Sequence, residues 1–252
     1  MYSREGLENE DEGGGAVALL SIILGSDLRM RRTANRRLWI LVVFLGWIVL
    51  AIIGLFVPDE SPQMLFRLLL VQQILFIVGG LMGSRPETLR LPKLGELGKG
   101  ILSGLGLFVV NTSLGALMVG AFTAVLGSET TTQIVLGERS GVELFLRSGE
   151  PNLIKGVIFL VTISAPISEE LFFRGLLLDS MCEIVGPGWA TFTAALVFAL
   201  LHFYVVQFIP VLAAGILLGV MFLRSGNIYR PMIAHSTANA LALAALISTL
   251  TA

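Results

Sequence analysis

Long apolar segments dominate this sequence and restrict its fold more than any other feature. A helix needs about 20 apolar residues to cross the hydrocarbon core of a bilayer. Seven segments of suitable length are predicted to do so: Leu38–Val57, Met64–Gly83, Ile101–Leu126, Leu153–Ile184, Trp189–Val206, Phe208–Leu223 and Met232–Leu250. We therefore predict an all-α fold, a polytopic transmembrane helical bundle of about seven spans, with six to eight as the range.

The composition agrees with a membrane protein and excludes one class of partner. Of the 252 residues, 55% are hydrophobic and only 14% are charged, far outside the range of a soluble domain. The net charge of −1 provides no attraction for nucleic acid, because such binding depends on a surplus of Lys and Arg. The bilayer is therefore the expected surrounding of most of the chain.

The chain divides into three parts. Residues 1–37 combine an acidic disordered tail, a short apolar segment at Ala16–Gly25 that is expected to lie along the interface, and a basic juxtamembrane stretch. Residues 38–150 form the N-terminal transmembrane helices, and residues 151–252 form the part that carries most of the buried polar groups. The longest connection, Gly127–Asn152, is predicted to be a loop.

The distribution of basic residues predicts the orientation of the chain. They gather in alternate connections: Arg29, Arg31, Arg32, Arg36 and Arg37, then Arg85, Arg90, Lys93 and Lys99, then Arg224 and Arg230. The intervening connections are acidic or nearly neutral. By the positive-inside rule the N-terminus is cytoplasmic, and an odd number of spans places the C-terminus on the other side.

Two carboxylates and a guanidinium lie within the fourth span. Inserting a charged side chain into the hydrocarbon core costs on the order of 2.5 to 3.5 kcal/mol of free energy, so each such residue is expected to have a charge partner or a function. Glu170 and Arg174 are four residues apart on one helical face, which predicts a structural ion pair. Glu169 is turned about 100° away from this pair in an α-helix, so it is expected to be free as a base or a ligand.

The only two histidines lie in the later spans. His202 follows Phe198 by one helical turn, so Phe198 is expected to pack at the same site, and His235 shares a helical face with Asn239. Counting residues along each span places Glu169 and His235 in the cytoplasmic half, and a shared site there is expected. Any one of these motifs alone could be a packing contact, but three together favour function.

These groups suit peptide hydrolysis. Glu169 with His202 can activate a water, and His235 with Asn239 can donate hydrogen bonds to the oxyanion. Glu169, His202 and His235 are also a ligand set that could bind zinc, although the HExxH motif of zinc proteases is absent. A non-catalytic membrane scaffold or substrate-binding module, or less favourably a proton or ion carrier, would also place such groups in a membrane.

Other polar and small residues are given structural roles. Gln72, Gln73 and Asn111 are expected to make contacts between helices, and the glycines are expected to allow close helix packing. Examples of such glycines are Gly104, Gly106, Gly215 and Gly219.

The three motifs, in this order on late spans, resemble those of the CPBP family of intramembrane proteases. This family contains the type II CAAX prenyl endopeptidases, bacteriocin-processing and self-immunity proteins, and abortive-infection proteins. The matching residues are Glu169-Glu170-x-x-x-Arg174, Phe198-x-x-x-His202 and His235-x-x-x-Asn239, and the resemblance covers about 151–252.

The resemblance implies a site in a cavity open to the cytoplasmic side. Within it, Glu169 and His202 would activate water, His235 and Asn239 would stabilise the oxyanion, and the Glu170–Arg174 pair would hold the architecture. The implied partner is a peptide or lipidated protein, including prenylated CAAX proteins. No cofactor is favoured, because Asn239 is a poor zinc ligand and a good donor, although zinc stays an alternative.

Overall fold

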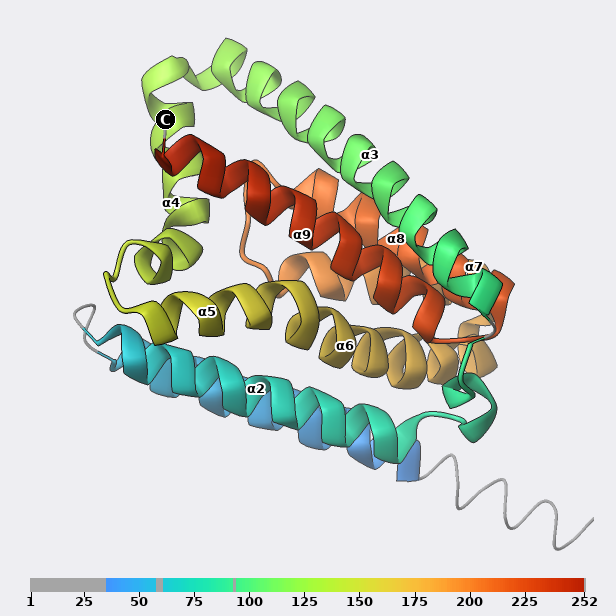
Figure 1. Cartoon of the computed structure of the whole chain (residues 1–252). Helices are drawn as coiled ribbons and strands as arrows, with labels where there is room; N and C mark the ends of the chain where they lie inside the picture. The colour runs from blue at the N-terminus through green and yellow to red at the C-terminus, as the bar shows by residue number, and fades with distance from the viewer. Residues whose placement is uncertain (1–34, 58–60, 93, 252) are drawn as a thin grey trace, which may run out of the picture.

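The computed structural model describes residues 35–57, 61–92 and 94–251, and this part of the chain is helical without strands (Figure 1). The predicted all-α fold is confirmed. The predicted acidic tail and the interfacial segment Ala16–Gly25 lie outside the described residues.

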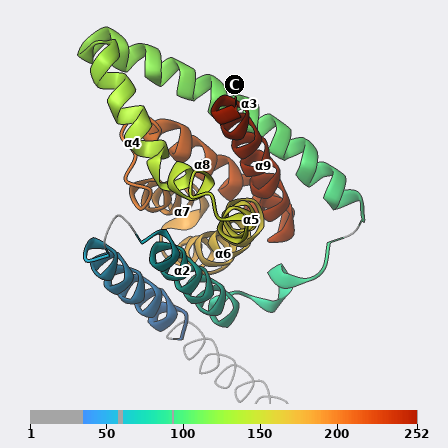
Figure 2. The same ribbon diagram turned by 60° about the vertical axis from the view of Figure 1, so that its left-hand side comes forward.

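The helices follow one another with short connections. After a first helix, Asn35–Leu55, the elements are α2 (Pro62–Gly83), η1 (Pro86–Leu89), α3 (Leu94–Leu126), α4 (Ser128–Leu146), α5 (Pro151–Phe159), η2 (Leu160–Ser164), α6 (Ala165–Glu169), η3 (Glu170–Leu178), α7 (Asp179–Leu200), α8 (Phe208–Ser225) and α9 (Tyr229–Thr251). Figure 2 shows α5 and α6 nearly end-on, with α2 on one side and α9 on the other.

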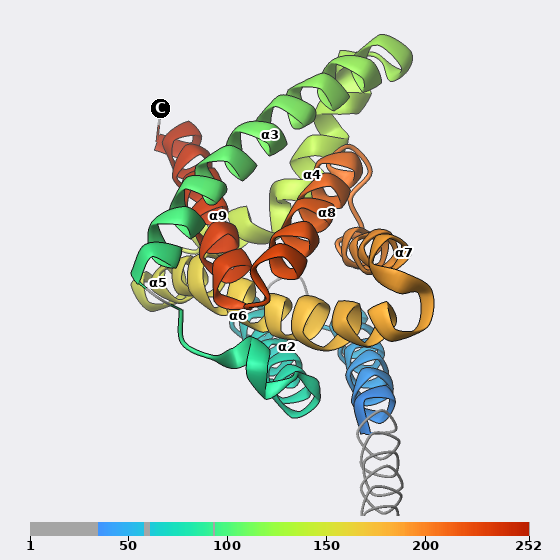
Figure 3. The same cartoon turned by 90° about the vertical axis from the view of Figure 1, so that its right-hand side faces the viewer.

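Six of the described helices are long and apolar enough to cross a membrane, and the longest runs from Pro151 to Leu200. This helix is broken at Gly186, whose φ of 76° and ψ of 166° are not helical, and Pro187 follows. The chain turns there (Figure 3), and this break divides the helix between the predicted fourth and fifth spans. The span number therefore falls within the predicted range.

Two predicted boundaries are wrong. The fifth span was expected to end at Val206, but its helix ends at Leu200, and Phe203 adopts a φ of 55° that interrupts the helix. The Phe203 ring stacks on the ring of Trp47 in the first helix, with 5.9 Å between the ring centroids. His202 consequently lies in the turn after the helix, not within a span.

The second correction concerns the predicted loop Gly127–Asn152, which contains the helix α4. Gly127 has a φ of 84° and separates α4 from α3. The helix is too polar to be recognised as a span, and Glu143 forms i,i+4 pairs with Arg139 and Arg147 along its surface, at 3.2 and 3.5 Å.

The centre of the bundle is η3, all of whose residues are buried. Phe172 stacks on Phe76 of α2 with 4.9 Å between ring centroids. Gly80 lets α2 approach this segment, because a Cβ at Gly80 would lie 2.7 Å from the backbone carbonyl carbon of Leu171. The expected close packing is also found at Gly104, Gly215 and Gly219. It is wrong for Gly106, where no atom lies within 4 Å of an added Cβ.

The two ends of the bundle differ in character. At one end, Arg36 of the first helix and Arg85 after α2 both bind Asp179, at 2.6 and 2.8 Å, and both also bind Glu183. The opposite end carries α4 and the C-terminal end of α9 (Figure 1). These salt bridges tie the first two helices to α7.

Candidate active site

A cavity of about 390 Å³ lies among α3, α4, α6, α8 and α9. Glu169, His202, His235 and Asn239 all line it. They come from α6, the turn after α7, and α9, so tertiary packing brings together groups that are far apart in the chain.

Glu170 is fully buried and lies at the centre of a polar cluster beside the cavity. Its Oε1 accepts a hydrogen bond from Arg174 Nη1 at 2.7 Å and lies 2.9 Å from His235 Nδ1. Arg174 also donates to the carbonyl oxygen of Gly215 in α8, at 3.1 Å. The pair predicted from spacing is present, and it is connected to His235.

Glu169 is closer to the partners of Glu170 than the predicted difference of about 100° in side-chain direction suggests. Oε2 of Glu169 lies 3.8 Å from Nε2 of His235, so both carboxylates approach one imidazole. The reason lies in the position of the His235 ring, whose Nε2 faces Glu169 and whose Nδ1 faces Glu170. Glu169 and Glu170 have ordinary α-helical dihedrals, so they still point in different directions from the helix and meet different sides of one imidazole.

The hydrogen-bond partners of both histidines indicate which ring nitrogen carries the proton. Nδ1 of His202 lies 2.7 Å from the carbonyl oxygen of Phe198, which can only accept, so Nδ1 carries a proton and Nε2 is left as an acceptor or base. His235 Nδ1 faces a carboxylate oxygen of Glu170 and is assigned as the donor there. His235 can then donate through Nε2 only as an imidazolium.

Phe198 packs against the groups of all three motifs. Its ring centroid lies 4.6 Å from that of His202 and 6.1 Å from that of His235. The guanidinium carbon of Arg174 lies 4.8 Å from the same ring centroid, a cation–π contact. Phe198 is 3% exposed, so it fixes these groups relative to one another.

Two asparagines line the cavity, and only one was assigned to the site from sequence. Asn239 Nδ2 donates to the carbonyl oxygen of Val161 at 3.0 Å, which uses one of its two N–H groups. Asn111 was interpreted as a contact between helices, yet it lines the cavity from α3. Gln73 does make the expected helix–helix contact, a short hydrogen bond with Ser168.

Glu138 is a cavity residue that the sequence did not predict, because the segment around it has no apolar pattern and is predicted to be a loop. Its Oε1 accepts hydrogen bonds from the backbone N–H groups of Val205 and Val206, at 2.6 and 2.7 Å, and its Oε2 accepts one from Gln207 at 3.2 Å. These amides precede the first turn of α8, where the helix dipole favours a negative charge. Glu138 thereby holds the turn that carries His202.

Tyr204 completes this wall of the cavity. Its ring lies 5.6 Å from that of His202, between centroids. Burial, and to a lesser degree the charges of Glu138 and Glu169, raise the pKa of the Tyr204 hydroxyl. The phenol is therefore neutral at physiological pH and can donate a hydrogen bond into the cavity.

The residues of the alternative zinc set share the cavity without forming a metal site. Within the described part of the chain, no three His, Cys, Asp or Glu side chains are arranged so that they could hold a metal ion. Glu169, His202 and His235 therefore do not fit a three-ligand zinc centre in this conformation, and no step below is assigned to a metal.

The cavity extends along the bundle. His235 is the residue of α9 nearest its N-terminus that lines the cavity, and the lining continues toward the C-terminus. The cavity therefore runs from Glu169 and His235 toward α4. The cytoplasmic N-terminus and the side of the membrane that the site faces stay predictions.

The fold and the apolar helices define a multi-pass integral membrane protein with a polar site inside its bundle. Residues 151–241 match the family model described as type II CAAX prenyl endopeptidase Rce1-like, which confirms the resemblance seen in the three motifs.

Two curated proteins are similar to part of the chain. An uncharacterized protein of Bacillus subtilis, YpbD, is 38% identical over 86 residues, which cover 32% of this chain and 41% of that protein. CAAX prenyl protease 2 of Rattus norvegicus is 32% identical over 78 residues, which cover 31% of this chain and 25% of that protein. The chain thus spans less than half the length of the curated relatives it matches. No solved structure matches it.

Proposed function

We propose that this protein is an intramembrane endopeptidase that hydrolyses a peptide bond of a membrane-associated substrate. The observation that carries the proposal is the convergence of Glu169, His202, His235 and Asn239 on one cavity. Its volume, about 390 Å³, falls within the range of ligand pockets. The similarity to the type II CAAX prenyl endopeptidases supports the same reaction.

The reaction begins with a water held between Glu169 and Nε2 of His202. Glu169 takes one proton from this water, and the oxygen attacks the carbonyl carbon of the scissile bond. The carbonyl oxygen becomes an oxyanion, which accepts hydrogen bonds from the free N–H of Asn239 and from Nε2 of a protonated His235. Collapse of the intermediate breaks the C–N bond, and Glu169 returns its proton to the leaving amine.

Glu170 and Arg174 do not touch the substrate in this mechanism. Glu170 orients His235 through Nδ1, as a carboxylate often does for a functional imidazole, and Arg174 neutralises Glu170. The contact between Asn239 and Val161 holds the amide at the wall of the cavity.

A proton or ion carrier is a less favourable function. Such a protein needs a continuous polar path between the two faces of the membrane. The candidate groups gather around one cavity, and a separate cavity toward the start of α9 is lined largely by apolar side chains such as Leu81, Ile228 and Met232.

The test uses purified protein in proteoliposomes with a library of lipid-anchored peptides, prenylated CAAX peptides included, and detects cleavage by mass spectrometry. We expect cleavage by the parent, its loss in Glu169→Gln and His202→Ala, and its retention in Glu129→Gln, a carboxylate in the first turn of α4. Cleavage by folded Glu169→Gln at the parental rate would contradict the mechanism. Binding of peptides without cleavage by the parent would favour the scaffold alternative.

A further inference from the structure

One polar side chain in the wall of the candidate site has an unpaired atom. Among the described residues that line this cavity, only Asn111 has a buried side-chain oxygen or nitrogen without a hydrogen-bond partner, its carbonyl oxygen Oδ1. The other carboxamide of the cavity, Asn239, donates to the carbonyl oxygen of Val161 at 3.0 Å. A buried acceptor without a partner costs free energy, so such a group in a native fold is expected to have a function.

Asn111 lies on the face of α3 that packs against α9. A Cβ at Gly104 would lie 2.6 Å from the carbonyl oxygen of Ala234, and Leu107 is buried. Positions 104, 107 and 111 are spaced by three and four residues, so they follow one side of the helix. The close helix contact at Gly104 is thus replaced, about two turns farther along α3, by the cavity wall at Asn111.

A second cavity, of about 550 Å³, lies between α3 and α9, which diverge toward α4 (Figure 1). Asn111, Arg139 and Asn239 line both cavities, so the two meet at these residues. Small residues form much of the second cavity: Gly115, Ala116, Ala238, Ala242 and Ala245. Small side chains let a main chain lie close to a helix, so this space suits an extended peptide that leads to the candidate site.

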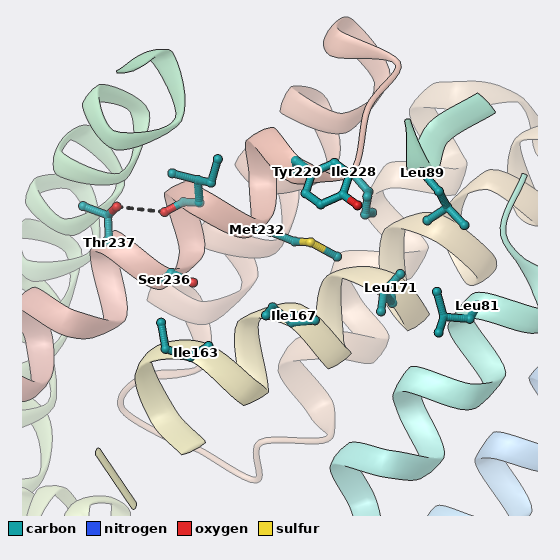
Figure 4. A pocket seen from close by; sticks show the side chains of 11 residues that line it. Leu81, Leu89, Ile163, Ile167, Leu171, Ile228, Tyr229, Met232, Ser236 and Thr237 are labelled. Carbon is teal, nitrogen blue, oxygen red and sulfur yellow. Dashed lines mark hydrogen bonds between the residues drawn. The ribbon is translucent and has the colours of Figure 1, made fainter. Parts of the chain in front are cut away.

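The cavity toward the start of α9 has no comparable group. It has a volume of about 420 Å³, and Figure 4 shows Ile167 and Leu171 along one wall, facing Met232. Thr237 also lines it and donates through Oγ1 to the carbonyl oxygen of Ile233 at 2.8 Å. None of the described residues that line it has a buried side-chain oxygen or nitrogen without a partner. The unpaired acceptor therefore distinguishes the cavity of the candidate site.

We propose that Asn111 binds the peptide backbone of the substrate beside the scissile bond. This proposal rests on the proposed function and adds a binding residue that lies outside the segment 151–241 matched by the family model. A carboxamide carries the same acceptor and donor as a peptide group, so Oδ1 accepts from a substrate N–H while Nδ2 donates to a substrate carbonyl oxygen. Rotation about the last side-chain torsion, which is only weakly restricted, presents Oδ1 to the cavity. Because every peptide bond carries these groups, Asn111 adds affinity without sequence preference.

The stability of Asn111→Leu separates substrate binding from the contact between helices that the sequence predicts. Leucine is similar in size and has no polar atom, so it removes the unpaired acceptor, and we expect a Tm in detergent equal to or above that of the parent. Gln73→Leu is the matched control, because Gln73 is also a buried amide in an apolar helix but is hydrogen-bonded to Ser168, and its Tm should fall. A fall in Tm for Asn111→Leu would identify a structural contact and overturn the proposal.

Binding is measured with the lipid-anchored peptides of the cleavage assay, in a Glu169→Gln background that keeps them intact. We expect peptides that raise the Tm of Glu169→Gln to bind about tenfold more weakly when Asn111→Leu is added. Replacing single peptide N–H groups by ester oxygens should weaken binding at one position, and this effect should disappear in Glu169→Gln/Asn111→Leu.

Equal binding by the two proteins, or no peptide that binds Glu169→Gln, would overturn the proposal. The same peptides distinguish it from the proposed function. Weaker binding by the Asn111→Leu protein, together with no cleavage of any peptide by the parent, would retain Asn111 as a peptide-binding residue and reject the protease.

Discussion

Oε1 of Glu170 lies 2.9 Å from Nδ1 of His235, and the same oxygen accepts a hydrogen bond from Arg174. Glu170 is therefore part of two arrangements at once, the buried ion pair of η3 and the orientation of a candidate catalytic imidazole. A substitution at this position should affect folding and chemistry together.

Glu170→Gln should reduce the stability of the folded protein. Removing one partner of a buried ion pair leaves an uncompensated charge, here that of Arg174, which costs about 3 to 5 kcal/mol. Thermal unfolding in detergent should show a lower Tm and a lower yield than for Glu169→Gln, whose side chain lines the cavity. If Glu170→Gln melted like the parent while activity vanished, Glu170 would be the catalytic glutamate instead.

Asn239→Ala should slow cleavage by about 10² to 10³, the usual cost of losing one oxyanion donor. Bound metal per chain should not change, because Asn239 is not a metal ligand in this mechanism. Cleavage and metal content are measured together on the parent, Asn239→Ala and Glu169→Ala. Stoichiometric zinc in the parent that disappears with activity in Glu169→Ala would favour the zinc alternative and leave the protease assignment unchanged.

Glu138→Ala should loosen the turn that carries His202. Hydrogen bonds to charged groups contribute roughly 1.5 to 3 kcal/mol each, and Glu138 accepts from three backbone amides. Hydrogen exchange should become faster at Val205, Val206 and Gln207, with a smaller change in Glu138→Gln and none in Glu129→Gln. Unchanged exchange in Glu138→Ala would show that the turn is held by its other contacts.

Gly104→Leu should destabilise the packing of α3 on α9, whereas Gly106→Leu should not. A Cβ at Gly104 would lie 2.6 Å from the carbonyl oxygen of Ala234, and one at Gly106 would meet nothing within 4 Å. Overpacking of this kind costs about 1 to 3 kcal/mol. Equal Tm values for the two variants in detergent would contradict the close contact.

Stability should decline at alkaline pH partly through Tyr204, whose pKa is raised mainly by burial. Above the ordinary tyrosine pKa of about 10, the unfolded chain loses this proton while the folded protein keeps it. The contribution is therefore fully present below that pH and is lost as the pH rises through the folded-state pKa. Tyr204→Phe should show a shallower loss of Tm between neutral and alkaline pH than the parent.

The sequence alone determined the class of the protein and predicted most of the candidate site. Hydropathy is a local sum over about 20 residues, so the spans could be located without knowledge of their packing. Glu169, His202, His235 and Asn239 could be selected because polar groups in apolar helices are costly and therefore rare. The ion pair of Glu170 and Arg174 also depended only on spacing within one helix.

Only the tertiary structure decided how these groups relate to one another. Both glutamates approach His235 because α9 packs beside α6 and places the imidazole between the two carboxylates, a contact between segments that no hydrophobic pattern encodes. Glu138 lies at the candidate site because α4 packs against the turn before α8, a contact between residues that are 67 to 69 positions apart in the chain. The position of the cavity was decided in the same way, because it depends on how separate helices pack against one another and not on any segment alone.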